Sequence, residues 1–254
     1  MLPIERRAEI IRLIRRDGSV KVGDLSTLFS VTEETIRRDL DKLGKEGQVK
    51  KTYGGAVLND NLSEDLSYID REKANIIEKR KIAEVANGLI KDGDTIFIDA
   101  STTALEVAKS IESSKEVTII TNSVYAIGQL SNYDNLKMIG IGGSLNEKTL
   151  AMEGPMATKF IDYYYADKVF FSVKGINKQK GVMDPREVTA DIKKHMIDNS
   201  RQSILVVDQT KFEQSAMVKT VEIGNIDIII TEYELDNKWV DYLSKNNIEV
   251  MVAK

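Results

Sequence analysis

The sequence predicts a multi-domain α+β protein, in which an N-terminal winged helix-turn-helix precedes an α/β domain with a mainly parallel sheet. Two observations indicate this division. Residues 1–58 combine helical patterns with a short hairpin and carry a net charge of +3, whereas the remainder carries −7. Beyond residue 95, apolar β-branched runs alternate with helical patterns, which is typical of a parallel sheet. We therefore expect domains at 1–58 and 71–254, joined by a polar linker at 59–70.

The composition excludes several classes of chemistry. The 254 residues include no Cys and one His, His195, so disulfides, Cys-ligated zinc, iron–sulfur clusters and multi-His metal sites are out. No metal or cofactor is expected. No apolar stretch reaches the roughly 20 residues that cross a bilayer, and the chain becomes charged at once, so a cytoplasmic protein is predicted.

Helical spacing of apolar residues predicts three helices in the first domain, over 4–16, 22–29 and 33–46. In the first helix the apolar positions are Ile4, Ala8, Ile11 and Ile14, and the arginines fall mostly on the other side. Thr32 is the expected N-cap of the third helix, whose inward row is Ile36, Leu40 and Leu43. Its opposite face presents Arg38, with Arg37 and Lys42 on the flanks.

A basic hairpin follows the third helix. Val49–Thr52 and Ala56–Leu58 read as short strands around a Gly54-Gly55 turn, with Lys50 and Lys51 on the hairpin. In a winged helix-turn-helix, the third helix enters the DNA major groove, where arginine can donate two hydrogen bonds to guanine. The wing lysines would contact phosphates. The alternative is a small helical interaction domain with solvated arginines.

Two segments of this domain resemble the DeoR family of bacterial transcriptional regulators. They read VTEETIRRDLDKL over 31–43 and EGQVKKTYGGA over 46–56. The resemblance implies operator binding, usually to repress a carbohydrate-related operon. It also implies that five residues of the third helix lie at the DNA: Thr32, Glu34, Thr35, Arg37 and Arg38.

The larger domain is predicted to begin with a long helix over 71–91. Strands are expected at 95–99, 117–121, 137–142, 168–174, 203–208 and 226–231. Helices are expected near 103–111, 124–130, 155–163, 188–200 and 237–245. Ligands of such sheets bind at the carboxyl ends of the strands, so the residues that follow each strand are the candidates.

The first predicted strand runs into Asp99-Ala100-Ser101-Thr102-Thr103 and then a helix. Free backbone N–H groups and hydroxyls at a helix N-terminus can hold a phosphate, and Asp99 could accept a sugar hydroxyl beside it. The same residues can equally be ordinary N-caps.

Other strand ends add further candidates to this edge. The second strand is followed by Thr121, Asn122 and Ser123, and the third by Gly-Ile-Gly-Gly-Ser over 140–144. Because residue 145 is Leu, the G-x-G-x-x-G dinucleotide fingerprint is absent. Lys174 ends the fourth predicted strand and Lys211 follows the fifth, and a lysine at either place could neutralise a phosphate or be merely solvated.

The larger domain also resembles the DeoR sensor domain, in segments such as IFIDASTTAL over 96–105 and DQTKF over 208–212. That fold is similar to ribose-5-phosphate isomerase. The likeness places Asp99, Ser101, Thr102 and Thr103 in a phosphate-binding loop and Lys211 near the sugar. Thr121, Asn122 and Gly143 would line the pocket. Ser101, where many relatives have Gly, and Lys174, where many have an acidic or small residue, depart from the pattern.

Three functions remain open. The leading hypothesis is a repressor that binds double-stranded operator DNA as a homo-oligomer, dimer or tetramer, and responds to a phosphorylated sugar. The second is a sugar-phosphate isomerase with a DNA-binding head, with Asp99, or else Glu187 or Glu153, as general base. The third is a partner-binding protein with a vestigial pocket.

Overall fold

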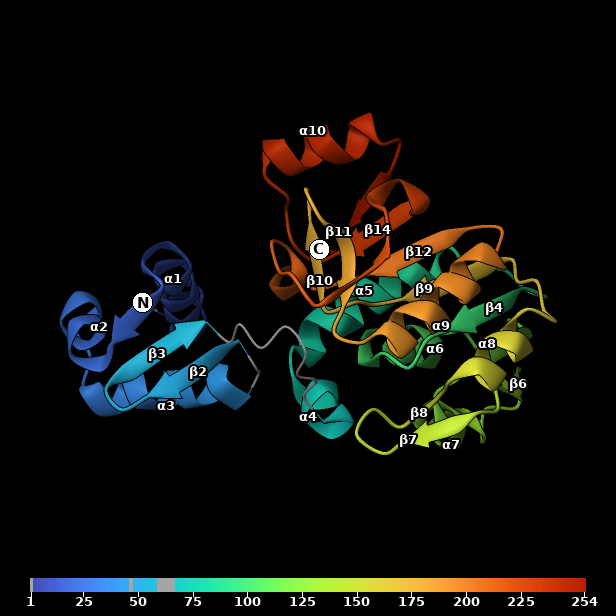
Figure 1. Ribbon diagram of the computed structural model, residues 1–254, viewed down its shortest axis with the longest axis horizontal. Helices are drawn as coiled ribbons and strands as arrows, with labels where there is room; N and C mark the ends of the chain where they lie inside the picture. Colours follow the sequence, from blue (N-terminus) through green and yellow to red (C-terminus); the bar gives the residue numbers. More distant parts are fainter. Residues whose placement is uncertain (1, 46–47, 59–66) are drawn as a thin grey trace. The chain divides into compact units, whose positions relative to one another are not determined.

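The computed structural model describes residues 2–45, 48–58 and 67–254, and the chain divides into two compact units, Met1–Asn61 and Leu62–Lys254 (Figure 1). Glu46, the predicted end of the third helix, and residues 59–66 of the predicted linker lie outside the described residues. Residues 67–70 are not linker, because a helix starts at Tyr68 and the Tyr68 side chain is buried.

The described part of the N-terminal unit contains three helices and a three-stranded antiparallel sheet. These elements are α1 (Pro3–Asp17), β1 (Ser19–Lys21), α2 (Val22–Phe29), α3 (Glu33–Lys45), β2 (Val49–Thr52) and β3 (Gly55–Leu58). Gly18 in a left-handed conformation ends α1. The sheet order β1-β3-β2 adds a strand that the hairpin pattern did not predict.

The wing turn differs from the prediction by one residue. Thr52 pairs with Gly55, so Tyr53 and Gly54 form the turn. A Cβ at Gly55 would lie 1.8 Å from the Val20 carbonyl oxygen. Glycine at this position therefore permits the close approach of β1.

The inward face of α1 also differs from the prediction. Ile4 is 60% exposed and Ala8 is exposed, whereas Arg6 is buried. Arg6 Nε donates to the buried Asp39 carboxylate of α3 at 2.5 Å. A charged residue occupies the inner face because a partner of opposite charge lies across the interface.

The second unit is a three-layer α/β/α domain built on a seven-stranded parallel sheet of order β15-β14-β12-β9-β4-β5-β6 (Figure 1). Its strands are β4 (Thr95–Ile98), β5 (Val117–Thr121), β6 (Leu136–Gly140), β9 (Lys168–Phe171), β12 (Ser203–Val206), β14 (Ile228–Thr231) and β15 (Glu249–Val252). Alternate residues of each strand enter separate cores, as Phe97 and Ile98 do. One core contacts α4 (Tyr68–Lys73), α5 (Ile76–Asn87), α6 (Thr102–Lys109) and α7 (Val124–Leu130). The other contacts α8 (Pro155–Ile161), α9 (Glu187–Asp198) and α10 (Asn237–Lys245).

Two small antiparallel sheets were not predicted. One joins β7 (Ser144–Asn146) to β8 (Ala151–Glu153), and the other joins β10 (Gly175–Asn177), β11 (Gly181–Asp184) and β13 (Val218–Val221). Short 3₁₀ helices occupy Gln209–Lys211 and Ile223–Asn225. The single helix expected over 71–91 is two helices, because Asn75 adopts a left-handed conformation with φ 52° between α4 and α5.

Candidate functional site

The N-cap of α3 and the apolar residues on its buried side determine which residues of this helix are exposed. The Thr32 hydroxyl accepts a hydrogen bond from the Thr35 amide at 3.3 Å, which begins the helix as predicted. Ile36, Leu40 and Leu43 are buried. Consequently Thr32 and four further predicted DNA-contacting residues are exposed: Glu34, Arg37, Arg38 and Lys42. Thr35 is half-buried.

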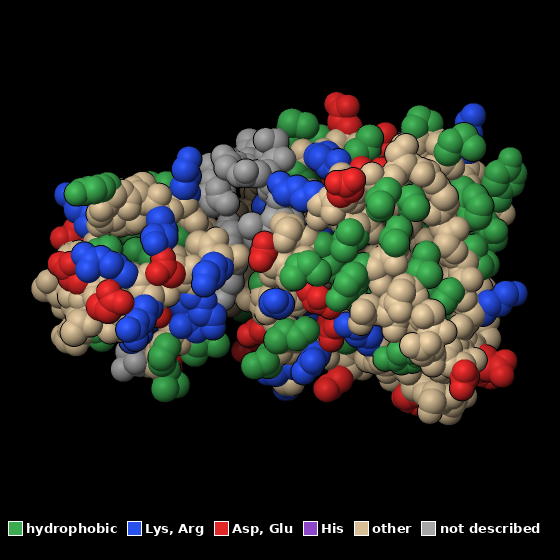
Figure 2. Space-filling model, turned by 90° about the horizontal axis from the view of Figure 1, so that it is seen from below, with side chains coloured by type: hydrophobic (Ala, Val, Ile, Leu, Met, Phe, Trp, Pro, Cys, Tyr) green, Lys and Arg blue, Asp and Glu red, His purple; other side chains and the backbone are tan. Residues whose placement is uncertain are grey.

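The cations of this face are paired with neighbouring carboxylates. Arg37 lies 2.7 Å from Glu33 and Arg38 lies 3.3 Å from Glu34, both across one helical turn. Lys51 of the wing pairs with Asp41 of α3. Figure 2 shows the same mixture of basic and acidic side chains on the N-terminal unit. Exposed pairs are weak, so phosphates can replace the carboxylates at little cost.

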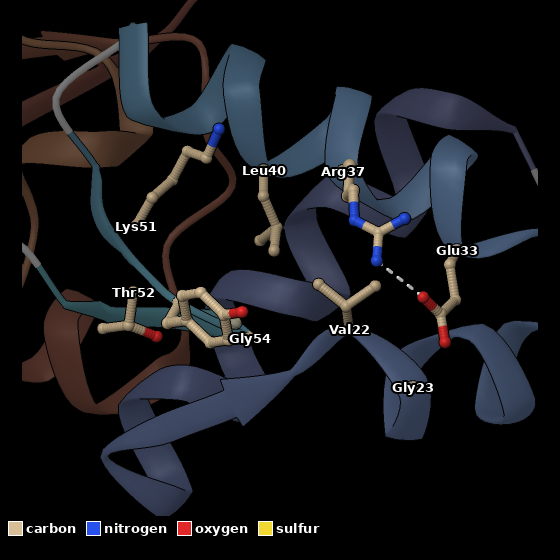
Figure 3. Close-up of a pocket in the computed structure, with 10 residues that line it drawn as sticks. Val22, Gly23, Glu33, Arg37, Leu40, Lys51, Thr52 and Gly54 are labelled. Atoms are coloured by element: carbon tan, nitrogen blue, oxygen red, sulfur yellow. Dashed lines mark hydrogen bonds and ion pairs between the residues drawn. The ribbon is translucent and has the colours of Figure 1, made fainter.

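A hollow of about 470 Å³ lies between α3, the start of α2 and the wing (Figure 3). Arg37 and Lys51 line it from opposite sides. The lining also includes Tyr53 of the wing turn, which is fully exposed and was not among the predicted contacts. The hollow beside α3 contains two cations and the Glu33 carboxylate, and once the cations exchange their carboxylate partners they have the chemistry to hold a sugar–phosphate backbone.

In the second unit, the strand order reverses direction at β4. The chain runs from β4 to β5 and β6 on one side, and then to β9, β12, β14 and β15 on the other. Such a switch point opens a crevice at the carboxyl ends of the two central strands. Asp99 follows β4 and Ser172 follows β9. The predicted loop Asp99–Thr103 therefore lies at the place where this topology favours a ligand.

The loop at the end of β4 is organised by its own side chains. The Ser101 hydroxyl donates to Asp99 Oδ1 at 2.5 Å and accepts from the Ala104 amide at 3.2 Å. The amides of Thr102 and Thr103 lie in the first turn of α6, where no intrahelical acceptor exists. Asp99, Ser101, Thr102 and Thr103 are all buried, so this loop is covered rather than open.

Beneath the loop lies a buried ion network. Lys193 of α9 is 2.6 Å from Asp184 and 3.6 Å from Asp99, and Asp184 also accepts from the Thr220 hydroxyl at 2.8 Å. Burial raises the pKa of Asp99, whereas Lys193 and the Ser101 hydroxyl lower it. Asp99 therefore stabilises the loop through its hydrogen bond from Ser101 and shares the Lys193 ammonium with Asp184.

Helix α4 covers one side of the loop. Tyr68 packs on Tyr125 of α7 with ring centroids 4.8 Å apart, and Thr102 Oγ1 donates to the Arg71 carbonyl at 3.4 Å. The buried hydroxyl of Tyr68 has no hydrogen-bond partner among the described residues. Burial raises the pKa of Tyr68, the Arg71 guanidinium lowers it, and the Glu72 and Asp99 carboxylates raise it further.

Asn122 provides a second unpaired polar atom at this edge. Ile98 pairs with Thr121 in the sheet, so Asp99 and Asn122 leave neighbouring strands side by side. Asn122 Nδ2 donates to the Met152 carbonyl at 3.0 Å, while its buried Oδ1 has no partner within the described parts of the chain. Unpaired buried polar atoms are costly, which favours a polar ligand here.

Lys79 of α5 and the loop that follows β12 place further charged groups near the loop at the end of β4. Lys79 is buried and donates to the Arg71 carbonyl. Burial lowers the pKa of Lys79 to about 8, with Asp208 raising it and Lys211 lowering it. The predicted residue Lys211 thus lies close enough to influence this cation. Burial raises the pKa of Glu232, after β14, to about 7.

The other predicted effector residues have structural partners. Thr121 is fully buried and accepts from the Ser123 amide at 3.1 Å. Gly143 has a φ of 148°, and a Cβ there would lie 2.7 Å from the Glu153 carbonyl. Lys174 is half-buried, and its amide donates to the Met183 carbonyl at 3.1 Å.

Sequence reasoning missed Lys79, Lys193 and Tyr68. A signal for the lysines was present: Lys79 falls in register with Ile82, Ala83 and Ala86, and Lys193 with Ala190, Met196 and Ile197. A charged residue in phase with an apolar row indicates a buried cation that needs a partner.

Comparison with known proteins identifies the class. The model of the DeoR-like helix-turn-helix domain matches residues 6–61, and that of the DeoR C-terminal sensor domain matches residues 74–233. The chain belongs to the DeoR family of DNA-binding transcriptional regulators.

Two relatives align along almost their whole length. The regulator YulB of Bacillus subtilis, named as uncharacterised, is 39% identical over 98% of this chain and 96% of its own. A putative aga operon transcriptional repressor of Escherichia coli O157:H7 is 31% identical over 98% and 93%.

Similarity to a solved structure at a TM-score above 0.5 extends to the fold alone. The tetrameric eIF2B-β2-δ2 complex of C. thermophilum gives a TM-score of 0.51 at 12% identity, over 96% of this chain and 71% of that chain. Ribose-5-phosphate isomerase A of Methanocaldococcus jannaschii gives 0.41 at 18% identity, over 55% of each chain. Within the described ranges, no helix is long and apolar enough to span a membrane. The same residues contain no group of three His, Cys, Asp or Glu side chains that could hold a metal ion.

Proposed function

We propose that the protein represses a carbohydrate uptake or catabolism operon, and that a phosphorylated sugar bound at the carboxyl edge of the β4–β9 sheet controls its affinity for DNA. We further propose that it acts in the cytoplasm as a homo-oligomer, a dimer or tetramer, because a single head makes few contacts. The relative named as a putative aga operon transcriptional repressor supports the repression of an operon.

The effector proposal rests on one observation. A loop with the backbone geometry of a phosphate-binding loop lies near buried polar atoms that have no hydrogen-bond partner among the described residues. The amides at the start of α6 suit an anion. Tyr68 and Asn122 supply a free hydroxyl and a free amide oxygen, which suit the hydroxyls of a sugar.

Catalysis is not proposed. The candidate base Asp99 is 2% exposed, and its oxygens are engaged by Ser101 and Lys193. Glu153 is buried against Arg186, and Glu187 is an exposed residue in the first turn of α9. Glu153 is therefore engaged by a structural contact, and Glu187 lies at the solvent-exposed surface.

DNA binding is tested by measuring affinity for the protein's own promoter and for random DNA over a range of salt. Arg38→Ala is expected to cost about 1–3 kcal/mol on the promoter and to reduce discrimination. Lys50→Ala should weaken both DNAs alike and lower the salt slope by about 1. Lys238→Ala, an exposed lysine of α10, is the control. Unchanged affinity in both test variants would refute DNA reading by this face.

The effector class is tested by thermal unfolding with sugars and their phosphates. A ligand at about 100 times its Kd should stabilise the protein by about 2.7 kcal/mol. Stabilisation by sugar phosphates but not by the free sugars is expected. No response to any of them favours the vestigial pocket.

A further inference from the structure

Helix α8, which lies beside α9 in Figure 1, carries apolar side chains on two faces. Ala157 and Ile161 face the core of the sensor domain and are fully buried. Met156, Phe160 and Tyr163 form a second row, spaced by four and three residues along the chain. The helical turn continues to the last of them, because the Tyr163 amide donates to the Phe160 carbonyl at 3.3 Å. A helix that is apolar on more than one face is normally buried on each of them.

Most of the second row is open to solvent. Met156 is 68% exposed and Tyr163 is 85% exposed, whereas Phe160 is half-buried against Tyr164, with ring centroids 5.4 Å apart. Tyr165, two residues further on, is 69% exposed. Methionine and aromatic residues are the types that protein–protein interfaces favour over the rest of the surface. We call this surface the α8 face: Met156, Phe160, Tyr163 and Tyr165.

The area of the α8 face suits a protein partner. Side chains of this size bury about 150–250 Å² each, so the exposed parts of Met156, Tyr163 and Tyr165 come to on the order of 400 Å². A stable interface takes about 800 Å² from each partner, so these three side chains supply about half of what one subunit needs. Pro155 and Lys159 beside them are also exposed and add to the available surface.

The charges beside the α8 face favour a second copy of this chain as the partner. Lys159 and Asp162 lie on one flank of the helix, because residues three apart are neighbours on a helical surface, and both are exposed. His195 and Asn199 both contact Asp162 through Oδ1, so Oδ2 can accept from another cation. When two copies of a helix pack antiparallel about a two-fold axis, each flank lies beside the same flank of the other copy in reverse order. Lys159 of each copy then lies within reach of Asp162 of the other.

We infer that α8 and the tyrosines that follow it form the interface between two copies of this chain, packed antiparallel about a two-fold axis at the middle of α8. Met156 of one copy then lies beside Tyr163 of the other, where a sulfur–aromatic contact adds to the apolar burial. A self-complementary surface of this kind closes as a dimer, which carries two DNA-binding units, as a repeated half-site requires. This inference rests on the proposed homo-oligomer and names the surface that forms it.

The interface is tested on the full-length protein by sedimentation velocity over a range of concentrations. Tyr163→Glu places a carboxylate in both halves of the interface, so self-association should weaken roughly 30-fold or more, the loss typical of a central aromatic residue. Val240→Glu, at an exposed apolar residue of α10, is the matched control and should sediment as the unsubstituted protein does. Melting followed by the fluorescence of Trp239 verifies that both variants are folded.

A second test is possible because the protein has no native cysteine. Met156→Cys and Tyr163→Cys in the same chain lie about 10 Å apart at roughly 1.5 Å per residue, too far to join within one copy. Oxidation should therefore give a covalent dimer, which a non-reducing gel detects. The pair Met156→Cys and Val240→Cys is the control and should give far less of it.

A smaller species for Tyr163→Glu and a covalent dimer of the cysteine pair are the expected results. An unchanged size of Tyr163→Glu, or cross-linking no greater than in the control pair, would overturn the α8 interface and leave the homo-oligomer standing. An unsubstituted protein that is monomeric at every concentration would remove both, and the α8 face would then serve a different partner. Promoter affinity, measured in parallel, tests the repressor proposal separately.

Discussion

The two units differ in where their functionally important cations lie: on the surface in the N-terminal unit and in the interior in the second unit. In the N-terminal unit, Arg37, Arg38 and Lys51 lie on the surface, each beside a carboxylate that water also reaches. In the second unit, Lys79 and Lys193 are buried. Exposed charges suit a large polyanion that approaches from solvent, because the exchange of partners costs little.

Buried charges suit a small ligand. Their interactions are stronger in a low-dielectric interior, but a ligand must open the structure to reach them. We therefore expect ligand binding in the sensor unit to require a movement, whereas the charged residues of the DNA-binding unit are already exposed. Among the described residues of the N-terminal unit, the buried pair Arg6–Asp39 differs from this pattern and joins α1 to α3.

The largest effect expected from this contrast between exposed and buried charges is that of Lys193→Met. The substitution leaves Asp184 and Asp99 without their shared cation, so the free energy of unfolding should fall by about 3–5 kcal/mol. Urea unfolding followed by the fluorescence of Trp239, the sole tryptophan, reports on the sensor unit alone. Lys194→Met, the exposed neighbour, should cost less than about 0.5 kcal/mol. Equal effects of the two variants would contradict a stabilising buried network.

A smaller effect is expected from Glu232→Gln. Because burial raises the pKa of Glu232 to about 7 from an ordinary value of 4.5, the folded state holds this proton more tightly than the unfolded state does. The resulting stability is complete below pH 4.5 and is lost as the pH rises through 7. Glutamine should therefore stabilise the protein at pH 8 by about 1–2 kcal/mol, allowing for partial exposure, and leave it unchanged at pH 4.

Urea unfolding at the two pH values measures the Glu232→Gln effect. Glu234→Gln, an exposed carboxyl two residues on, is the control and should show no such dependence. A Glu232→Gln effect that is the same at both pH values would mean that the carboxyl does not titrate in this window.

The smallest effect is expected from Glu33→Gln in the DNA-binding unit. Loss of the exposed pair with Arg37 should lower the free energy of unfolding by at most about 0.5 kcal/mol. Freeing Arg37 should nevertheless raise DNA affinity roughly two- to threefold at low salt and less at high salt. Fluorescence anisotropy with labelled promoter DNA measures this gain. Glu249→Gln, an exposed residue of the sensor unit, should not reproduce it.

Much of the fold was predictable because hydrophobic periodicity is local. Rows such as Ile36, Leu40 and Leu43 predicted the helices, and the β-branched runs predicted the parallel strands. The predictions failed where a single residue interrupted the period, as at Asn75, and at some of the short strands, as in β1 and β15. Such short elements are stabilised by their partners rather than by their own pattern.

The candidate site was predictable in part. Parallel topology brings the ends of β4, β5, β9 and β12 to one edge, so Asp99, Asn122 and Lys211 could be proposed together from their positions after strands. The covering of that edge by α4 could not be predicted, because it depends on a carbonyl and a tyrosine that come from before the sheet begins.

By itself, the order of residues determined the helices, the parallel sheet and the two-part division, because each depends on spacing along the chain. Only the tertiary structure decided how the in-phase charges are satisfied: Arg6 by Asp39, Lys193 by Asp184, and Lys79 by a backbone oxygen. The reason is physical. A buried charge is tolerated only beside a specific partner, and that partner lies far along the sequence or on the backbone, where no periodicity records it.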